Sequence, residues 1–296
     1  MADHIAGTWC DLGDAAGSVG VGLQRIQVDP DKWSTPAHVE GAEEEIFFVL
    51  GGSGLSWQDG ETYAVGPGDC LVHLAGEQAH TLRAGSDGLD ALAFGERAYH
   101  GNTHLPRAGV SWMWPAFVEA TTIGPEQHPY LREAAAGEPE VGEPAERPAR
   151  IVNLEDVDGL AWKRGRVVSE RRDLGRASGS VRTGLKHVTV SPGKWAVVTH
   201  CHSAEEELFV VLEGDGVVAL GEEEFPVRRG HVVARPPATG VAHSFRAGAS
   251  GLTLLAYGTR EPNDISYYPH SNKIFFRGVG VIGRIEKLDY WDGEEL

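Results

Sequence analysis

The chain has 296 residues, of which 41% are hydrophobic, and a formal net charge of −17. This length suits two domains of ordinary size, each with its own core. The acidic charge argues against nucleic acid and anionic membranes as partners, because both attract basic surfaces. No segment approaches the roughly 18 apolar residues of a membrane span, and the N-terminus lacks a basic, apolar leader. An odd count of three cysteines fits a reducing compartment, so we expect a cytoplasmic protein.

The chain contains the same pattern twice. Residues 11–95 and 173–258 share glycines, a tryptophan, a histidine and a glutamate at an offset of 162. The offset becomes 163 by His80 and His243, so one loop residue was gained between the two points. A period this long indicates a duplicated domain rather than a solenoid unit.

Each copy consists mostly of short apolar runs with turn residues between them. Residues 46–50 and 208–212 have the length and composition of buried strands. Asp59 and Gly60 are a strong hairpin signal. Short strands at even spacing predict an all-β protein whose domains are antiparallel barrels or jelly rolls.

We expect three parts along the chain. Residues 1–123 form an N-terminal barrel with an aromatic extension, which carries Trp112, Trp114 and Phe117 and packs across the barrel. Residues 124–150 form an exposed linker rich in Pro, Glu and Ala, with a short helix at 130–136. Residues 151–296 form a C-terminal barrel. The apolar run 274–282 is expected to add a strand to a sheet edge or to a dimer face.

A cluster in the second copy has the composition of a metal site. In an extended chain, alternate side chains share one face, so the two histidines of His200-Cys201-His202 point the same way. We expect a later histidine and a glutamate to complete a site for a divalent transition metal, with the ligands His200, His202, Glu207 and His243. Ligand type alone leaves Fe, Mn, Ni and Zn open. Glu205 and Glu206 are expected to be solvated turn residues.

These residues follow the spacing His-x-His-x4-Glu-x6-Gly from His200 to Gly214, which resembles the first motif of the cupin superfamily. The second cupin motif is matched loosely by Pro236, Gly240 and His243, with Ala247 where the motif has Asn. The resemblance covers both repeats. It implies a bicupin with two tandem double-stranded β-helix (jelly-roll) barrels joined by an irregular linker. Because cupins commonly form dimers, the resemblance also implies a homodimer. It does not fix the reaction, because one fold hosts many functions.

The first copy departs from this pattern at one position. Its sequence His38-Val39-Glu40 has a glutamate in place of the second histidine, while Glu45 and His80 are kept. A second metal site formed by these four residues is expected to be harder and more negative. The alternative is that this barrel has lost its metal and Glu40 is only a polar lining residue.

Two further residues occupy equivalent positions on the strand that leads to the last ligand. If Arg235 faces inward, its guanidinium can bind a carboxylate or phosphate through two parallel hydrogen bonds, in a bidentate pair. If His73 faces inward, it can support a ligand or act as a general base. Both are therefore candidate catalytic residues, and the alternative is that both face solvent.

Four protein ligands leave two positions of a six-coordinate ion open, so we expect an enzyme that binds a small polar metabolite on the metal of the C-terminal barrel. A dioxygenase-like oxidoreductase is the first hypothesis. The second is a decarboxylase or sugar-phosphate isomerase, for which Arg182, Lys186 and Arg235 are the candidate anion-binding residues.

The competing hypothesis is a non-catalytic cupin that binds a small ligand through its metal. The lining of the barrel should separate these classes. An apolar lining favours binding or dioxygenation, whereas His, Lys, Tyr or Glu near the open positions favours acid–base chemistry.

Overall fold

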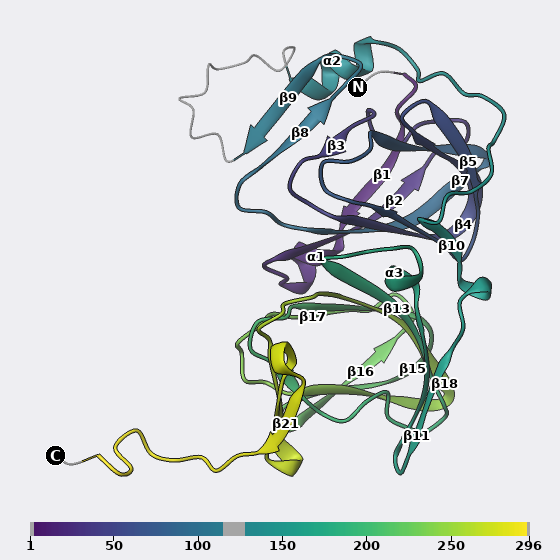
Figure 1. The fold of residues 1–296 in the computed structure, drawn as a ribbon. Coiled ribbons are helices and arrows are strands. Elements are labelled where there is room, and N and C mark those ends of the chain that lie inside the picture. The colour runs from purple at the N-terminus through teal and green to yellow at the C-terminus, as the bar shows by residue number, and fades with distance from the viewer. Residues whose placement is uncertain (1–2, 115–127, 295–296) are drawn as a thin grey trace.

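The computed structural model describes residues 3–114 and 128–294 of the chain. Two β-barrels lie one above the other, with the short helices α1 (Leu12–Ala16) and α3 (Leu174–Ala177) between them (Figure 1). The two helices begin alike, because Asp11 and Asp173 each accept a hydrogen bond from a backbone N–H of the first helical turn. The all-β bicupin architecture expected from the repeat is thus present.

The N-terminal barrel is built on a seven-stranded sheet of order β1-β2-β7-β4-β6-β10, with β5 paired to β4. Its strands are β1 (Gly7–Asp11), β2 (Val21–Val28), β4 (Glu45–Gln58), β5 (Glu61–Val65), β6 (Asp69–His73), β7 (His80–Glu96) and β10 (Ile151–Asn153). A three-stranded sheet follows it, formed by β3 (Val39–Glu40), β8 (Gly101–Leu105) and β9 (Val110–Trp114).

The C-terminal barrel repeats this plan, with a seven-stranded sheet of order β11-β12-β13-β18-β15-β16 and β17 paired to β15. Its strands are β11 (Leu160–Arg164), β12 (Val167–Asp173), β13 (Thr183–Val190), β15 (Glu207–Leu220), β16 (Glu223–Arg228), β17 (Val232–Arg235) and β18 (His243–Thr259). The accompanying small sheet has the order β14-β19-β20-β21, with β14 (Cys201–His202), β19 (Ile265–Tyr268), β20 (Lys273–Phe276) and β21 (Val281–Arg284). The described residues also include the 3-10 turns η2 (Leu154–Asp156), η3 (Pro269–Ser271) and η4 (Arg277–Val279).

The expected strand at 274–282 is therefore two strands, β20 and β21, interrupted by η4. It extends the small sheet that begins at β14, which confirms the sheet-edge alternative. Val281 and Ile282 on β21 remain more than half exposed. A contact between two copies through this edge stays a prediction.

The glycines that end the repeated motif sit at a bend in the longest strands. Both β4 and β15 shift register around Gly52 and Gly214, where φ is +76° and +77°. A Cβ on Gly52 would lie 2.2 Å from the carbonyl oxygen of Gly88, and one on Gly214 would lie 2.1 Å from that of Gly251. Only glycine fits this bend, which curls each strand around its barrel.

The segment between the repeats is fastened to the first barrel. The expected helix is present as α2 (Pro129–Ala135). Beyond it, the backbone oxygens of Glu140 and Gly142 accept hydrogen bonds from Trp57 and Thr62. Residues 151–153, expected in the C-terminal barrel, form β10 and pair with β6 of the N-terminal sheet instead. Phe117 of the aromatic extension lies outside the described residues.

The two barrels share one apolar core. Side chains from the facing walls form a single buried cluster, which includes Leu23 and Phe94 from one barrel and Leu185 and Tyr257 from the other. The rings of Phe94 and Tyr257 stack with their centroids 5.0 Å apart. Burial of this surface fixes the barrels against each other.

Two buried carboxylates reinforce this contact in a symmetric way. Glu44 accepts hydrogen bonds from the backbone N–H groups of residues 181–183 in the second barrel. Its counterpart Glu206 accepts from the N–H groups of Val19 and Gly20 in the first. The expectation that Glu205 and Glu206 are solvated is wrong, because both are at least 95% buried. Glu206 is hydrogen-bonded to the N–H groups of Val19 and Gly20, and Glu205 is paired with Arg277, so the partners of both lie far away in the sequence.

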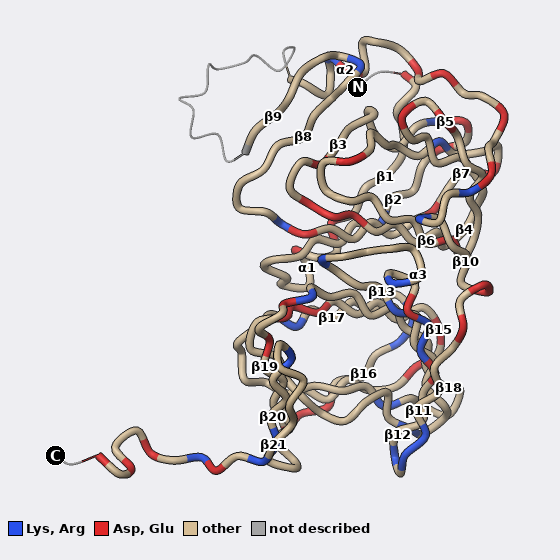
Figure 2. Tube along the Cα trace, in the orientation of Figure 1, with Lys and Arg blue, Asp and Glu red and all other residues tan. Residues whose placement is uncertain are grey.

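Charges are spread unevenly over the two barrels. Basic residues gather at the turn between β11 and β12, which includes Lys163, Arg164 and Arg166 (Figure 2). Among the described residues, no helix has the length and apolar character needed to cross a membrane.

Candidate metal centres

The structure brings together the four proposed ligands of the C-terminal barrel. His200 and His202 flank Cys201 at β14, Glu207 opens β15 and His243 opens β18. Glu207 Oε2 lies 2.9 Å from His243 Nε2 and 3.5 Å from His202 Nε2. Donor atoms of His200, Glu207 and His243 all lie within 4.8 Å of one another. These separations are those of groups that can share one ion.

The histidine rings are oriented with one nitrogen toward this shared point. His200 Nδ1 is 2.9 Å from the carbonyl oxygen of Val198, and His202 Nδ1 is 2.7 Å from Oδ2 of Asp264. A ring that donates through Nδ1 keeps an unprotonated Nε2, which is the form that binds a metal.

Burial sets the charge of the cluster. It lowers the pKa of His200 to about 4, so this ring is neutral at neutral pH. Burial alone would raise the pKa of Glu207, but the attraction of His243 and His202 outweighs it and lowers this pKa. The result is one carboxylate among imidazoles, a donor set that suits divalent Fe, Mn, Ni or Zn.

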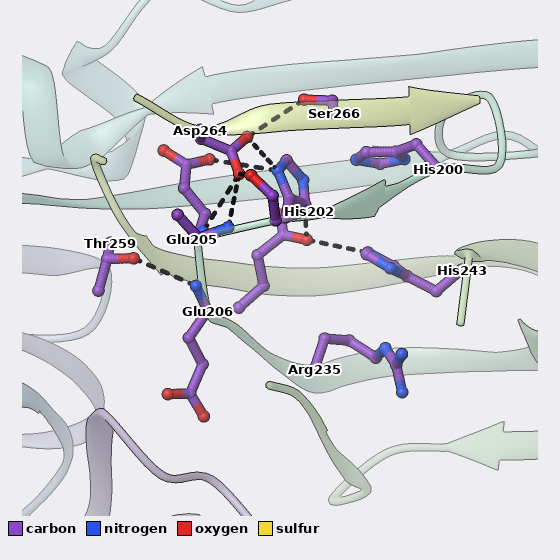
Figure 3. A network of polar contacts seen from close by, with 12 residues as sticks. His200, His202, Glu205, Glu206, Arg235, His243, Thr259, Asp264 and Ser266 are labelled. Atoms are coloured by element: carbon purple, nitrogen blue, oxygen red, sulfur yellow. Dashed lines mark hydrogen bonds and ion pairs between the residues drawn. The ribbon is translucent and has the colours of Figure 1, made fainter. Parts of the chain in front are cut away.

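Three atoms of this cluster have no hydrogen-bond partner among the described residues. His202 Nε2, Glu207 Oε2 and His243 Nε2 are buried, and none of them makes a hydrogen bond of good geometry. Buried polar atoms are normally satisfied. A cation at the point toward which they converge would satisfy all three, so the residues fit a divalent metal (Figure 3).

Sequence reasoning missed Asp264, which orients His202. Asp264 also accepts hydrogen bonds from the backbone N–H groups of Ala204 and Glu205, and it is fully buried. It lies beyond the repeated segment, just before β19, and no spacing in the motif points to it. Figure 3 shows it beside His202 and Ser266.

The N-terminal barrel assembles its own cluster. Donor atoms of His38, Glu45 and His80 lie within 4.8 Å of one another, and His80 Nε2 is 2.9 Å from Glu45 Oε2. Burial lowers the pKa of His38 to about 4, so this ring is also neutral. Nδ1 of His38 lies 2.8 Å from the backbone oxygen of Pro36, and Nδ1 of His80 lies 3.1 Å from that of Gln78. Both rings therefore present Nε2 to the cluster.

Glu40 lies beside this cluster, with Oε1 3.7 Å from His38 Nε2. Burial and the nearby charge of Glu45 raise its pKa to about 8. Both carboxylate oxygens accept from the hydroxyl of Thr103 on β8. Glu40 therefore occupies the place that His202 has in the other barrel. Thr103 of the small sheet holds Glu40, and Asp264, just before β19 of the other small sheet, holds His202.

The cavity of the C-terminal barrel combines apolar walls with charged and polar side chains. It has a volume of about 250 Å3 and is lined by the cluster and by Arg171, Lys186, Tyr268 and Arg277. The Arg171 guanidinium lies 3.8 Å from the centroid of the Trp162 ring and donates to the backbone oxygen of Ala196. Arg277 is paired with the carboxylate of Glu205. Three cationic side chains thus face a small chamber next to the proposed metal ligands.

Other candidates lie elsewhere. Arg182 is at the barrel–barrel contact, 3.0 Å from Glu96. Arg235 donates to Thr239 and to the backbone oxygen of Val241, in the loop that precedes His243. Figure 3 shows its guanidinium turned away from the His202–Asp264 pair. Of the three cations suggested by the sequence, Lys186 alone lines the C-terminal cavity.

His73 is buried rather than solvent-facing. Its ring stacks on that of His80, with centroids 3.8 Å apart and planes 6° from parallel. Burial holds its pKa well below the usual value, and neither ring nitrogen has a hydrogen-bond partner in the part of the chain that the structure describes. His73 is thus placed to pack behind a proposed ligand, and it does not line the N-terminal cavity.

Comparison with known proteins agrees with this geometry. The family profile described as "Cupin domain" matches residues 24–94 and 186–255, one segment in each barrel. Oxalate decarboxylase from Bacillus subtilis superposes with a TM-score of 0.57 at 16% identity, covering 86% of this chain and 72% of that one. This likeness concerns the fold.

Two shorter matches cover less than half of this chain. A candidate sugar phosphate isomerase from Acidithiobacillus ferrooxidans has 29% identity and a TM-score of 0.39, over 42% of this chain and 82% of that one. A sugar phosphate isomerase of the cupin superfamily from Silicibacter pomeroyi has 25% identity and a TM-score of 0.41, over 49% and 95%. Neither score carries an argument about the reaction. The two profile matches, one per barrel, and the two-barrel superposition show that the chain belongs to the cupins and is a bicupin.

Proposed function

We propose that the C-terminal barrel is the active site of a metal-dependent enzyme that acts on a small metabolite bearing a carboxylate or phosphate. The observation that carries this proposal is the presence of the cations Arg171 and Lys186 in the cavity lining, beside the four proposed ligands; Arg277 also lines the cavity but is paired with Glu205. A chamber of about 250 Å3 holds only a small substrate. Its cations compensate the charge of an anion that leaves water.

The residues would divide the work as follows. His200, His202, Glu207 and His243 would hold the metal, which supplies Lewis-acid polarisation of a substrate oxygen when bound. Arg171 is held in place by Trp162 and by the Ala196 backbone, so it would fix the anionic end of the substrate without reorganising. The reacting carbon would then lie between a fixed cation and the metal ligands.

Polar groups near the open positions favour acid–base chemistry over dioxygenation. Lys186 and Tyr268 line the cavity, and the Tyr268 ring stacks on that of His200 with centroids 5.9 Å apart. Burial raises the pKa of Tyr268, so its hydroxyl stays protonated and can donate a hydrogen bond to substrate. A decarboxylation or isomerisation is therefore the reaction type that the site supports best.

The test is calorimetric binding of malonate to the metal-loaded protein, followed by turnover assays of small hydroxy and keto acids with and without oxygen. Arg171→Leu should weaken malonate binding about tenfold or more, because a hydrogen bond to a charged group is lost. The matched substitution in the other barrel, Trp9→Leu, should leave it unchanged. Equal affinity in both variants, or turnover in air only, would contradict the proposal. Binding without turnover of any acid tested would favour the non-catalytic cupin.

A further inference from the structure

The N-terminal barrel encloses a larger cavity of different character. It has a volume of about 650 Å3 and reaches from the His38–Glu45–His80 cluster to helix α2. Apolar side chains dominate its walls, among them Ile26, Phe47, Leu82 and Leu131. A cavity of this size and composition is typical of a site for an apolar small molecule.

The two barrels differ at matching positions. Trp9 lies opposite Ile26 in the pairing of β1 with β2, and Arg171 lies opposite Val188 in the pairing of β12 with β13. Trp9 and Arg171 are thus equivalent residues, and each lines the cavity of its own barrel. An aromatic side chain in one barrel takes the place of a cation in the other.

On the neighbouring strand too, a neutral residue in the first barrel corresponds to a cation in the second. Gln24 on β2 lines the N-terminal cavity, and its counterpart Lys186 on β13 lines the C-terminal one. Leu82 is likewise matched by the bulkier Phe245, which contributes to the smaller volume of the second cavity. Among the described residues that line the N-terminal cavity, none is Lys or Arg, whereas Glu40 and Glu45 are present.

An aromatic cap, the Tyr130 ring of α2, forms part of the cavity wall. The Tyr130 ring of α2 lies 6.2 Å from the His38 ring and 6.0 Å from that of Trp112, measured between centroids. Glu133 of α2 is fully buried and accepts from the N–H of Ala108 in the β8–β9 turn. The cap is therefore fixed to the barrel and adds aromatic surface to the site.

We propose that the N-terminal barrel is a second binding site, selective for a neutral and largely aromatic molecule whose single hydroxyl or carbonyl oxygen reaches the His38–Glu45–His80 cluster. An anion would lie beside Glu45 and would find no compensating Lys or Arg in the described lining, so burial of its charge is opposed by desolvation and repulsion. The protein thus presents one site for a small anion and one for an apolar neutral ligand.

The test uses a pair of probes that differ chiefly in charge, 2-naphthol and 2-naphthoate, with calorimetry on the full chain. We expect 2-naphthol to bind once per chain and 2-naphthoate to bind this barrel at least about tenfold more weakly.

Two matched variants show which barrel binds the probe. Ala93 faces Phe47 across the β4–β7 pairing and lines the first cavity, while Ala256 faces Phe209 and lines the second.

Ala93→Leu should weaken 2-naphthol binding at least about tenfold by filling the cavity, and Ala256→Leu should leave it unchanged. Denaturant unfolding of both variants checks that each is folded. Should Ala93→Leu fail to fold, Gln24→Lys tests the same idea by adding a cation to the cavity lining. It should reduce the ratio of the affinity for 2-naphthol to the affinity for 2-naphthoate.

Three results would overturn the proposal. They are equal affinity for the two probes, loss of 2-naphthol binding in Ala256→Leu, and an unchanged probe preference in Gln24→Lys. Failure of malonate to bind the C-terminal barrel would leave this proposal intact, because the two sites are probed by different ligands.

Discussion

His202 Nδ1 and Asp264 Oδ2 lie 2.7 Å apart, in a contact that links the cupin motif of the C-terminal barrel to the chain beyond the repeat. The carboxylate also accepts from two backbone N–H groups, and its pKa is held below the usual range despite burial. It is therefore an ionised, fixed acceptor that sets the tautomer of His202.

Asp264→Asn should lower metal affinity in the C-terminal barrel about 10–100-fold, because the amide neither fixes the ring nor raises its basicity as a carboxylate does. Competition with a metal-binding dye would measure the change. Asp215→Asn, which alters an exposed carboxylate of β15 that contacts Ser250 on β18, is the control. An affinity equal to that of the control would show that Asp264 does not position the ligand.

Replacing the one divergent ligand should alter the metal preference of the first barrel. Glu40→His restores the second histidine of the motif and should raise affinity for Ni and Zn relative to Mn, because imidazole suits these ions better than carboxylate does. Elemental analysis should be done in a His243→Ala background, so that the C-terminal site contributes little. Unchanged occupancy and unchanged preference would mean that Glu40 lies outside the coordination sphere.

The symmetric carboxylates between the barrels should contribute strongly to stability. Glu44→Ala leaves the backbone N–H groups of residues 181–183, of which that of Thr183 is buried, without an acceptor and should lower the free energy of unfolding by about 2–4 kcal/mol. Glu206→Ala should act in the same direction. Urea denaturation measures both, with the exposed Glu222→Ala as the control. A loss no larger than in the control would contradict the role given to these anchors.

Thiol reactivity should distinguish the cysteines without any substitution. Burial raises the pKa of Cys70 to about 12, so this thiol stays protonated and inert well above neutral pH. Cys10 is exposed. Iodoacetamide at pH 8 should label Cys10 in the native protein and reach Cys70 only after unfolding, as peptide mapping would show. Equal labelling of Cys10 and Cys70 in the native state would contradict the burial of Cys70 in the apolar core that the two barrels share.

The parts of the fold predicted from sequence are those encoded locally. His200 and His202 share a face because strand side chains alternate, and the motif glycines mark bends where only glycine fits. The duplication then located Glu45 and Glu207 at equivalent places. Strand alternation and glycine bends depend only on residues close together in the sequence, and each occurs in both repeats.

The missed residues depend on contacts that no local pattern encodes. Glu206 looked solvated in an acidic run, yet it bonds to N–H groups 186 and 187 residues away. Asp264 and Arg277 enter the site from the extension after the repeat, which has no counterpart motif. Arg171 becomes informative only once the strand register places it opposite Val188 and inside the barrel.

The most direct test of the account is elemental analysis of the metal-reconstituted protein beside His243→Ala and its N-terminal counterpart His80→Ala. We predict that His243→Ala loses one equivalent of a divalent transition metal together with malonate binding, while His80→Ala keeps both. A protein that takes up no metal after reconstitution, or a His243→Ala variant with unchanged metal content, would contradict the central claim.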